Sequence, residues 1–547
     1  MRYIQSNLIF YGFTISFHHS KEVFVCCLIV SLPCVFWVAP SIRGGGIDSP
    51  RPASQRAAAF ILTAAMLTTL AAPAFAGTWY IENGDITVKA GKTGNDVTQN
   101  NETTYGDTGT VITGKSDKNT VTIEAKDEDD KVEVKLDNVN IDTSKQNKAA
   151  VSVTGSGDTT IELDGDNKLK SGSAHAGLEH NKTDTSGELT IQDNDKNGSL
   201  KAAGGQYGAG IGGAGVNDAQ VKITGGKITA TGGEYGAGIG GGFKGSGDVT
   251  ISGGEIHANG GNYGAGIGGG DYSSGKVTIS GGEINATGGY LGAGIGGGEK
   301  GRGDVTITGG EITSATGGKY GAGIGGGKEG RGDVTIEGNT EVNAAGGAGG
   351  AGIGGGYVAK NNSNQITIKS NENGSPTVNA VGGSRDKTTK FGGAGIGAGG
   401  DSTATTDITL EGKVTINATA GKDNAAIGAN GIEQEFPGLA GGTSITRKDS
   451  DKNDISPLPG DNVPDTDTPS GGGSTGGDST GGDSAGGDSA GGGSSGGGSA
   501  DASVQESVFP GLVVTDKDGQ RISYTSIRDN NVLSLRVGRF TASLRAS

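Results

Sequence analysis

The chain has 547 residues, of which 112 are glycine, while aromatic residues make up only 5% and hydrophobic residues 32%. So little apolar side chain excludes one large globular core and leaves either a flexible chain or a repeat architecture. The formal net charge of −16 also argues against nucleic acid as a partner, because general electrostatic attraction to phosphates is missing.

The N-terminal region predicts a secretory signal. Residues 60–76 form an apolar run that ends in AFA, the small-x-small pattern of signal peptidase sites, and Arg51 and Arg56 precede it. We expect 51–76 to be a signal peptide, which indicates a secreted or cell-surface bacterial protein; a membrane helix is disfavoured because the run is short. Residues 1–50 hold a second apolar run and all three cysteines, which favours a non-native upstream extension. The mature chain is expected to contain no transmembrane helix.

Residues 77–200 show strand signals without glycine repeats. Segments such as TVTIEA, KVEVKLDNVNI and GELTIQD alternate apolar and polar residues, which is typical of half-buried strands. We interpret them as the N-terminal coils of a solenoid. Trp79 and Tyr80 begin this part and are candidates for an N-terminal cap, since an exposed coil edge would promote aggregation.

The segment 201–435 is built from Gly-rich repeats of about 28 residues. The sequence GAGIGGG recurs, and two other short apolar segments recur with the same spacing. One has the pattern VTI, and the other follows a GG pair. The central isoleucine of the GIG motif falls at Ile211, Ile239, Ile267, Ile295, Ile324, Ile353 and Ile396, and at Ile427 in the related sequence AIG. Each repeat thus has three short apolar segments in which apolar and polar residues alternate, and this indicates three short strands per coil.

These features predict an all-β fold, a right-handed parallel β-helix whose coils stack about 4.8 Å apart through strand hydrogen bonds. Val and Ile are expected to point inward and to stack on the same residue one coil away. A calcium β-roll needs aspartate in every nonapeptide and collagen needs glycine at every third position, and the sequence satisfies neither pattern.

The C-terminal part changes composition. Residues 436–468 form an extension of the repeats, and 469–500 consist almost entirely of glycine, serine and aspartate, which is typical of a flexible linker. Strand-like sequence returns in 501–547, which we interpret as a small β-rich module.

A candidate metal site lies where the N-terminal coils meet the glycine repeats. Asp193, Asp195 and Asn197 alternate in the sequence DNDKNG, so that three oxygen ligands could face one calcium ion while the glycine permits a sharp bend. The motif lacks the glutamate of a complete calcium loop, and an acidic β-turn is the alternative interpretation. Calcium is the cofactor that this pattern suggests.

The repeats also place like side chains in columns. Tyrosine recurs at Tyr207, Tyr235, Tyr263 and Tyr320, with Leu291 in between, and glutamate recurs at Glu255, Glu283 and Glu311. Stacked tyrosine rings could form a surface for sugar rings or could stabilise the coils. Carboxylates about 4.8 Å apart repel one another, which indicates exposure, cation bridging or both. These seven residues are the candidates for carbohydrate binding.

An enzymatic function is poorly supported. Downstream of the signal peptide there is no cysteine and no HExxH sequence, and GxSxG occurs only in the Gly/Ser/Asp-rich segment 469–500, where no nucleophile elbow is expected. Arg302 and Arg331 are candidates for the base of a polysaccharide lyase by residue type alone. They occupy matched repeat positions, and catalytic residues are seldom copied once per repeat. We therefore predict no catalytic residues.

The sequences GTWYIENGDITV, KLDNVNIDT, TTIELDGDNKL and ELTIQDNDKNGSLKAAGGQYGAGIGG carry a resemblance over about 77–435. The chain resembles the secreted carbohydrate-binding-domain proteins of gut-type Firmicutes, which are related to the pectate-lyase-like right-handed β-helix superfamily. The resemblance implies a β-helix that binds a polysaccharide or cell-surface glycan, with bound calcium and little catalysis. The unusually glycine-rich repeats of this chain are a departure from that family.

The expected function is therefore non-enzymatic carbohydrate binding at or outside the cell surface. One alternative is an adhesive stalk, in which the β-helix is a rigid spacer that presents the C-terminal module. The other alternative is a polysaccharide lyase.

Overall fold

A computed structural model describes residues 76–360 and 363–461 in full, together with the backbone of five short strands near the two ends of the chain. Those strands are β1 (Leu8–Phe10), β2 (Phe13–Ile15), β37 (Thr525–Asp529), β38 (Val532–Val537) and β39 (Phe540–Arg545). The predicted signal peptide up to residue 75 and the predicted linker 469–500 lie outside the described residues. The chain divides into two units, Met1–Thr468 and Pro469–Ser547. In the second unit, β37, β38 and β39 form an antiparallel sheet.

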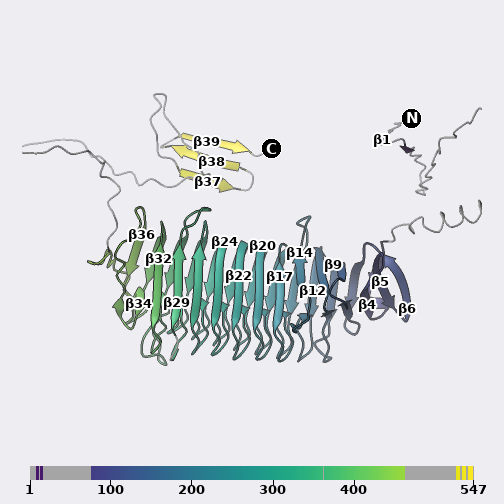
Figure 1. Cartoon of the computed structure of the whole chain (residues 1–547), viewed down its shortest axis with the longest axis horizontal. Helices are drawn as coiled ribbons and strands as arrows, with labels where there is room; N and C mark the ends of the chain where they lie inside the picture. Colours follow the sequence, from purple (N-terminus) through teal and green to yellow (C-terminus); the bar gives the residue numbers. More distant parts are fainter. Residues whose placement is uncertain are drawn as a thin grey trace, which may run out of the picture. The chain divides into compact units, whose positions relative to one another are not determined.

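The first unit contains a parallel β-helix, as the sequence predicted, and its coils follow one another in chain order (Figure 1). Each Gly-rich coil contributes strand segments to three faces. The first face contains β8 (Val121–Ala125), β10 (Val151–Gly155), β13 (Leu178–His180), β16 (Ile211–Gly212), β19 (Ile239–Gly240), β21 (Ile267–Gly268), β23 (Ile295–Gly296), β25 (Ile324–Gly325), β28 (Ile353–Gly354), β31 (Ile396–Gly397) and β34 (Ile427–Ala429). The glycine-repeat strands of this face are only two or three residues long.

The second and third faces are formed by longer strands, some of which bend at a glycine pair and serve both faces. They are β7 (Val111–Ser116), β9 (Lys131–Asp142), β11 (Asp158–Asp164), β12 (Asp166–Lys170), β14 (Leu189–Gln192), β15 (Ser199–Ala203), β17 (Ala219–Ile223), β18 (Lys227–Thr231), β20 (Gly247–Asn259), β22 (Gly275–Thr287), β24 (Gly303–Thr316), β26 (Gly332–Glu337), β27 (Glu341–Ala345), β29 (Asn364–Lys369), β30 (Thr377–Val381), β32 (Thr406–Glu411), β33 (Thr415–Thr419) and β36 (Ser444–Lys448).

The parallel pairing stays in register along the whole stack of glycine repeats. The isoleucine of each first-face strand pairs with that of the next coil, without a break from Ile211 to Ile427. In the coil that contains β20, Val249 and Ile251 point into the core from the second face, and Ile256 and Ala258 do so from the third. All of these side chains are 0–1% exposed. One core residue therefore rests on its counterpart in the neighbouring coil, as predicted.

The repeated glycines are required by the close approach of adjacent coils. Gly240 has φ of +131°, and a Cβ there would lie 2.0 Å from the carbonyl oxygen of Gly268 in the next coil. A Cβ on Gly236 would lie 2.1 Å from the carbonyl oxygen of Gly208. Any larger residue at these positions would force the coils apart, so GAGIGGG is a packing sequence and not a flexible one.

Both ends of the stack are closed by non-repeating structure. At the N-terminal end, β3 (Thr78–Tyr80) and the 3-10 helix η1 (Ile81–Asn83) precede β4 (Ile86–Gly91), β5 (Gly94–Gln99) and β6 (Glu102–Asp107). β4 pairs antiparallel with β5, and β5 with β6, so the terminal strands break the parallel pattern. Trp79 packs against the core, and its indole Nε1 donates a hydrogen bond to Asp107 Oδ2 at 2.8 Å.

At the C-terminal end, β35 (Ile432–Glu433) turns back on β34, and β36 adds one more strand to the third face. Arg447 lies in register with Ala418, at the end of the column that is alanine in the coils before it. Its guanidinium is fully buried and donates hydrogen bonds to both carboxylate oxygens of Asp461, beside the ring of Phe436. The residues after the last coil therefore cover the open end of the core.

No helix with the length and apolar character of a membrane span occurs in the described residues.

Candidate functional site

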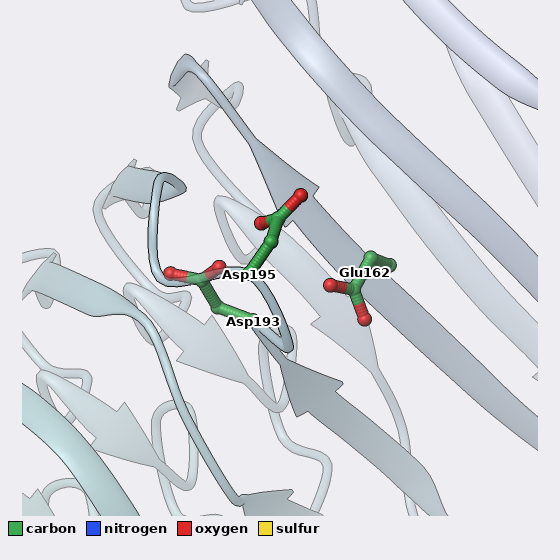
Figure 2. Close-up of side chains that lie close together, drawn as sticks. All are labelled: Glu162, Asp193 and Asp195. Atoms are coloured by element: carbon green, nitrogen blue, oxygen red, sulfur yellow. The ribbon is translucent and has the colours of Figure 1, made fainter.

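Three carboxylates meet at the predicted metal site, and Figure 2 shows them side by side. Glu162 lies on β11, while Asp193 and Asp195 lie on the loop after β14, one coil further along. Each contributes a carboxylate oxygen, and these oxygens all lie within 4.8 Å of one another. We call these three residues the acidic cluster. Three carboxylates at this spacing are the oxygen donor type that calcium prefers.

The structure adds a carboxylate that the sequence expectation did not include, that of Glu162. Asn197 donates its backbone N–H to Asp193 Oδ1 at 3.2 Å and so helps to close the loop, while its side chain stays a predicted ligand. Sequence reasoning missed Glu162 because it stands 31 residues before Asp193; aligning TTIELDG with ELTIQDN would have placed it beside the loop.

Part of the cluster's charge is already compensated. Both oxygens of Glu162 accept hydrogen bonds from Asn194, one from its backbone N–H and one from its side-chain amide, each at 2.7 Å. Lys135 Nζ lies 3.3 Å from the nearby Asp164. Burial lowers the pKa of Lys135, but its hydrogen bond to Asp164 and the charges of the acidic cluster outweigh this and raise that pKa. Asp195 is exposed at the mouth of the cluster.

The tyrosine column is brought together over three coils. The rings of Tyr207 and Tyr235 stack with centroids 5.3 Å apart and an interplanar angle of 7°, and those of Tyr235 and Tyr263 with 5.0 Å and 11°. Phe243 packs edge-on against the first two rings. The faces of the central ring are covered by its neighbours, so a sugar could reach that ring only along its edge.

Beyond Leu291 the aromatic arrangement changes. Tyr320 stacks on Tyr357 with centroids 5.4 Å apart and meets Tyr290 edge-on. Lys319 lies over both Tyr290 and Tyr320 and forms an ion pair with Asp386 at 3.0 Å. The structure therefore places Tyr320 in a second aromatic group, which is held by the inserted loop that lengthens this part of the repeat.

The glutamate column lies on the third face and is longer than expected. The register aligns Lys227, Glu255, Glu283, Glu311 and Glu341. Glu255 Oε1 lies 2.6 Å from Lys227 Nζ and 3.0 Å from His257 Nε2, and these hydrogen bonds lower the pKa of Glu255. The next three glutamates are exposed to solvent, which keeps the repulsion between them small.

A polar groove that the sequence did not reveal lies where the second face begins. Its volume is about 250 Å³, and its charged and hydroxyl lining comes from consecutive coils: Lys182, Asp218, Ser246, Asp248, Ser274, Lys276, Arg302 and Asp304. Asp248 Oδ2 lies 3.0 Å from Lys182 Nζ and 3.4 Å from Lys276 Nζ. Arg302 Nη2 lies 2.6 Å from Asp333 Oδ2 and 3.5 Å from Asp304 Oδ2.

The alternation of charge in this groove comes from small differences between repeats. Asp248, Lys276 and Asp304 occupy the same register position in three successive coils. Ser246 and Ser274 stand two residues before the first two of them. Aligning the repeats in the sequence would have placed these residues in one column.

These observations define the class of the protein as a parallel β-helix with one structural repeat per coil. Comparison with protein families agrees: residues 221–243, 249–271, 277–299, 305–328 and 334–357 match the family model described as beta helix repeat. Comparison with curated proteins and with solved structures gave no match.

Proposed function

We propose that the protein is secreted or held at the bacterial cell surface and binds a polysaccharide or cell-surface glycan in the polar groove without transforming it. The observation that carries this proposal is the composition of the groove, in which lysine, aspartate, arginine and serine side chains follow one another along the coils. An extended glycan lying along the axis would meet a new set of donors and acceptors at each coil. The resemblance to secreted carbohydrate-binding proteins points in the same direction.

The ion pairs within the groove favour binding over catalysis. The Asp248 carboxylate accepts from two lysines, so it is already engaged by neighbouring cations. Arg302 contacts two carboxylates. A guanidinium is in any case a poor choice for the base of a lyase, because arginine is protonated at all physiological pH values. The same pairs hold the side chains in fixed positions before a ligand arrives, which lowers the entropic cost of binding.

A glycan array and a pull-down on plant polysaccharides, with residues 77–547, test the proposal. The variant in which Lys182 and Lys276 are both changed to Gln should lose most of the binding. Lys201→Gln is the matched control, because Lys201 is exposed on the third face and outside the groove. Failure of every glycan to retain the wild-type protein would overturn the proposal. Release of products that absorb in the ultraviolet would favour the lyase instead.

We further propose that the acidic cluster binds calcium as a structural cofactor. Asp195 would offer the most accessible carboxylate, and Glu162 would have to give up hydrogen bonds to Asn194 or use its remaining lone pairs. Calcium should raise the apparent Tm of the wild type and not that of Asp195→Asn, with Asp407→Asn as an exposed control on β32. An apparent Tm that is the same in excess calcium and in excess EDTA would contradict this proposal.

The adhesive stalk is the second candidate, and the unbroken isoleucine column favours it. A stack in which every coil rests on an equivalent coil is a rigid spacer. In that case glycan or cell binding would survive in the full chain with the groove variant and would be lost when residues 501–547 are removed. The two candidate functions therefore predict opposite results for the same pair of proteins.

A further inference from the structure

Two acidic residues occupy the same inward position in consecutive coils, four residues after the GIG isoleucine. The column consists of Phe243, Asp271, Glu299, Lys328 and Tyr357. The backbone N–H of Asp271 donates to the carbonyl oxygen of Tyr235 at 2.8 Å, and that of Glu299 donates to the carbonyl oxygen of Tyr263 at 2.9 Å. The same backbone contact thus fixes both carboxyl groups, one coil apart and next to the tyrosine column.

Both carboxyl groups are removed from solvent. Asp271 is only 2% exposed and Glu299 only 7%. Oδ1 of Asp271 is buried and has no hydrogen-bond partner, and none of the ion pairs in the described residues includes Asp271. A buried carboxylate without a direct counter-charge is strongly unfavourable, so the charged form of Asp271 strains this part of the stack.

The surrounding cations compensate only part of this charge. Lys328 Nζ lies 3.4 Å from Glu299 Oε1 and shares its charge with Glu329 at 3.3 Å. On the coil before Asp271, Lys244 is exposed. On the coil after it, Lys300 is exposed and lies over the ring of Tyr272, 4.6 Å from the centroid. The backbone of Tyr272 also stabilises the Asp271 carboxylate, though less than burial disfavours it.

We propose that protonation of Asp271, one coil away from Glu299, is a pH-sensitive switch that stabilises the contact between two Gly-rich coils. With the proton present, the buried carboxyl group of Asp271 is neutral and does not repel the Glu299 carboxylate. Without it, two buried like charges lie on adjacent coils, which are spaced roughly 4.8 Å apart. The contact is therefore relaxed in mildly acidic surroundings and strained at neutral pH and above.

The pH range follows from the environment of Asp271. Burial first, and the charge of Glu299 second, raise the pKa of Asp271 from an ordinary 3.8 to about 6. The folded chain therefore binds this proton more tightly than the unfolded chain does. The stabilising contribution is complete below pH 3.8 and is lost as the pH rises through about 6.

The test measures the apparent Tm of the full chain between pH 5 and pH 8 for the wild type, Asp271→Asn and Glu299→Gln, all at one scan rate. Because other groups also titrate, each variant is compared with the wild type at the same pH. Asp271→Asn should raise the apparent Tm by about 3 °C above pH 7 and by much less at pH 5. Glu299→Gln should have the same sign. Asp407→Asn, an exposed aspartate on β32, should shift the profile by less than about 1 °C at any pH.

Hydrogen exchange supplies a local measurement. At pH 7.5, Asp271→Asn should slow exchange in peptides that cover residues 264–300 and leave those of the N-terminal coils unchanged. An Asp271→Asn variant that is less stable than the wild type above pH 7, or one whose difference from the wild type does not change with pH, would overturn the proposal. A calcium-dependent rise of the apparent Tm that disappears in Asp271→Asn would mean that a bound cation, and not a proton on Asp271, relieves the repulsion.

Discussion

The isoleucine column makes a sharp prediction for Ile267→Ala. Ile267 is 0% exposed and is paired with Ile239 on one side and Ile295 on the other. Its strand, β21, has only two residues, of which the second is glycine. Ile267 is therefore the large side chain with which β21 anchors the first face of this coil to the core.

The magnitude follows from the atoms removed. Truncation to alanine removes side-chain carbons worth about 2.4 kcal/mol, at about 0.8 kcal/mol for each buried methylene. The cavity adds about 1 kcal/mol, because neighbouring coils fixed by glycine contacts cannot collapse into it. The local cost is about 3 kcal/mol. In a stack that gains its stability from nearest neighbours, the loss should fall mainly on the coils next to residue 267.

Hydrogen exchange, resolved by peptide, measures this distribution, and thermal unfolding measures the total effect. Ile432→Ala is a matched control, since Ile432 is 73% exposed, and it should change stability by less than about 0.5 kcal/mol. A loss below about 1 kcal/mol for Ile267→Ala, or an equal loss of protection in every coil from residue 121 to residue 429, would refute the reasoning.

Three other substitutions address separate features. Tyr235→Ala should cost about 2 kcal/mol because the ring is stacked on both faces, while glycan retention in a pull-down should stay unchanged if the column is structural. Arg447→Met should lower stability by about 3 kcal/mol, because the buried carboxylate of Asp461 loses its counter-charge. Limited proteolysis of the C-terminal end would detect this loss, and adding Asp461→Asn should restore part of the stability. Burial lowers the pKa of His180, so the wild type should lose stability as the pH falls below 6.5. His180→Gln should reduce this loss, and a difference in Tm between variant and wild type that does not change with pH would contradict the prediction.

The fold was largely predictable because its signals are local and repeated. The spacing of Ile211, Ile239 and Ile267 gave the coil length, and the alternation in Val249-Thr250-Ile251 gave the strand type. The stacking of the coils then followed from the pairing of equivalent residues in adjacent repeats. The ends were less predictable, because they do not repeat. Nothing in the sequence around Arg447 indicates that a guanidinium would replace alanine in the core.

The sequence by itself thus determined the solenoid, its three faces and the columns of like residues, since each follows from periodicity along the chain. Only the tertiary structure decided what those columns do. It brought Glu162 into the acidic cluster, turned the tyrosine faces toward one another, formed the polar groove from aligned charges, and buried Asp271 beside Glu299. These outcomes depend on the directions of the side chains and on where the loops of neighbouring coils lie. Aligned repeats in the sequence predict which residues are neighbours, but not whether these residues face water, the core or each other.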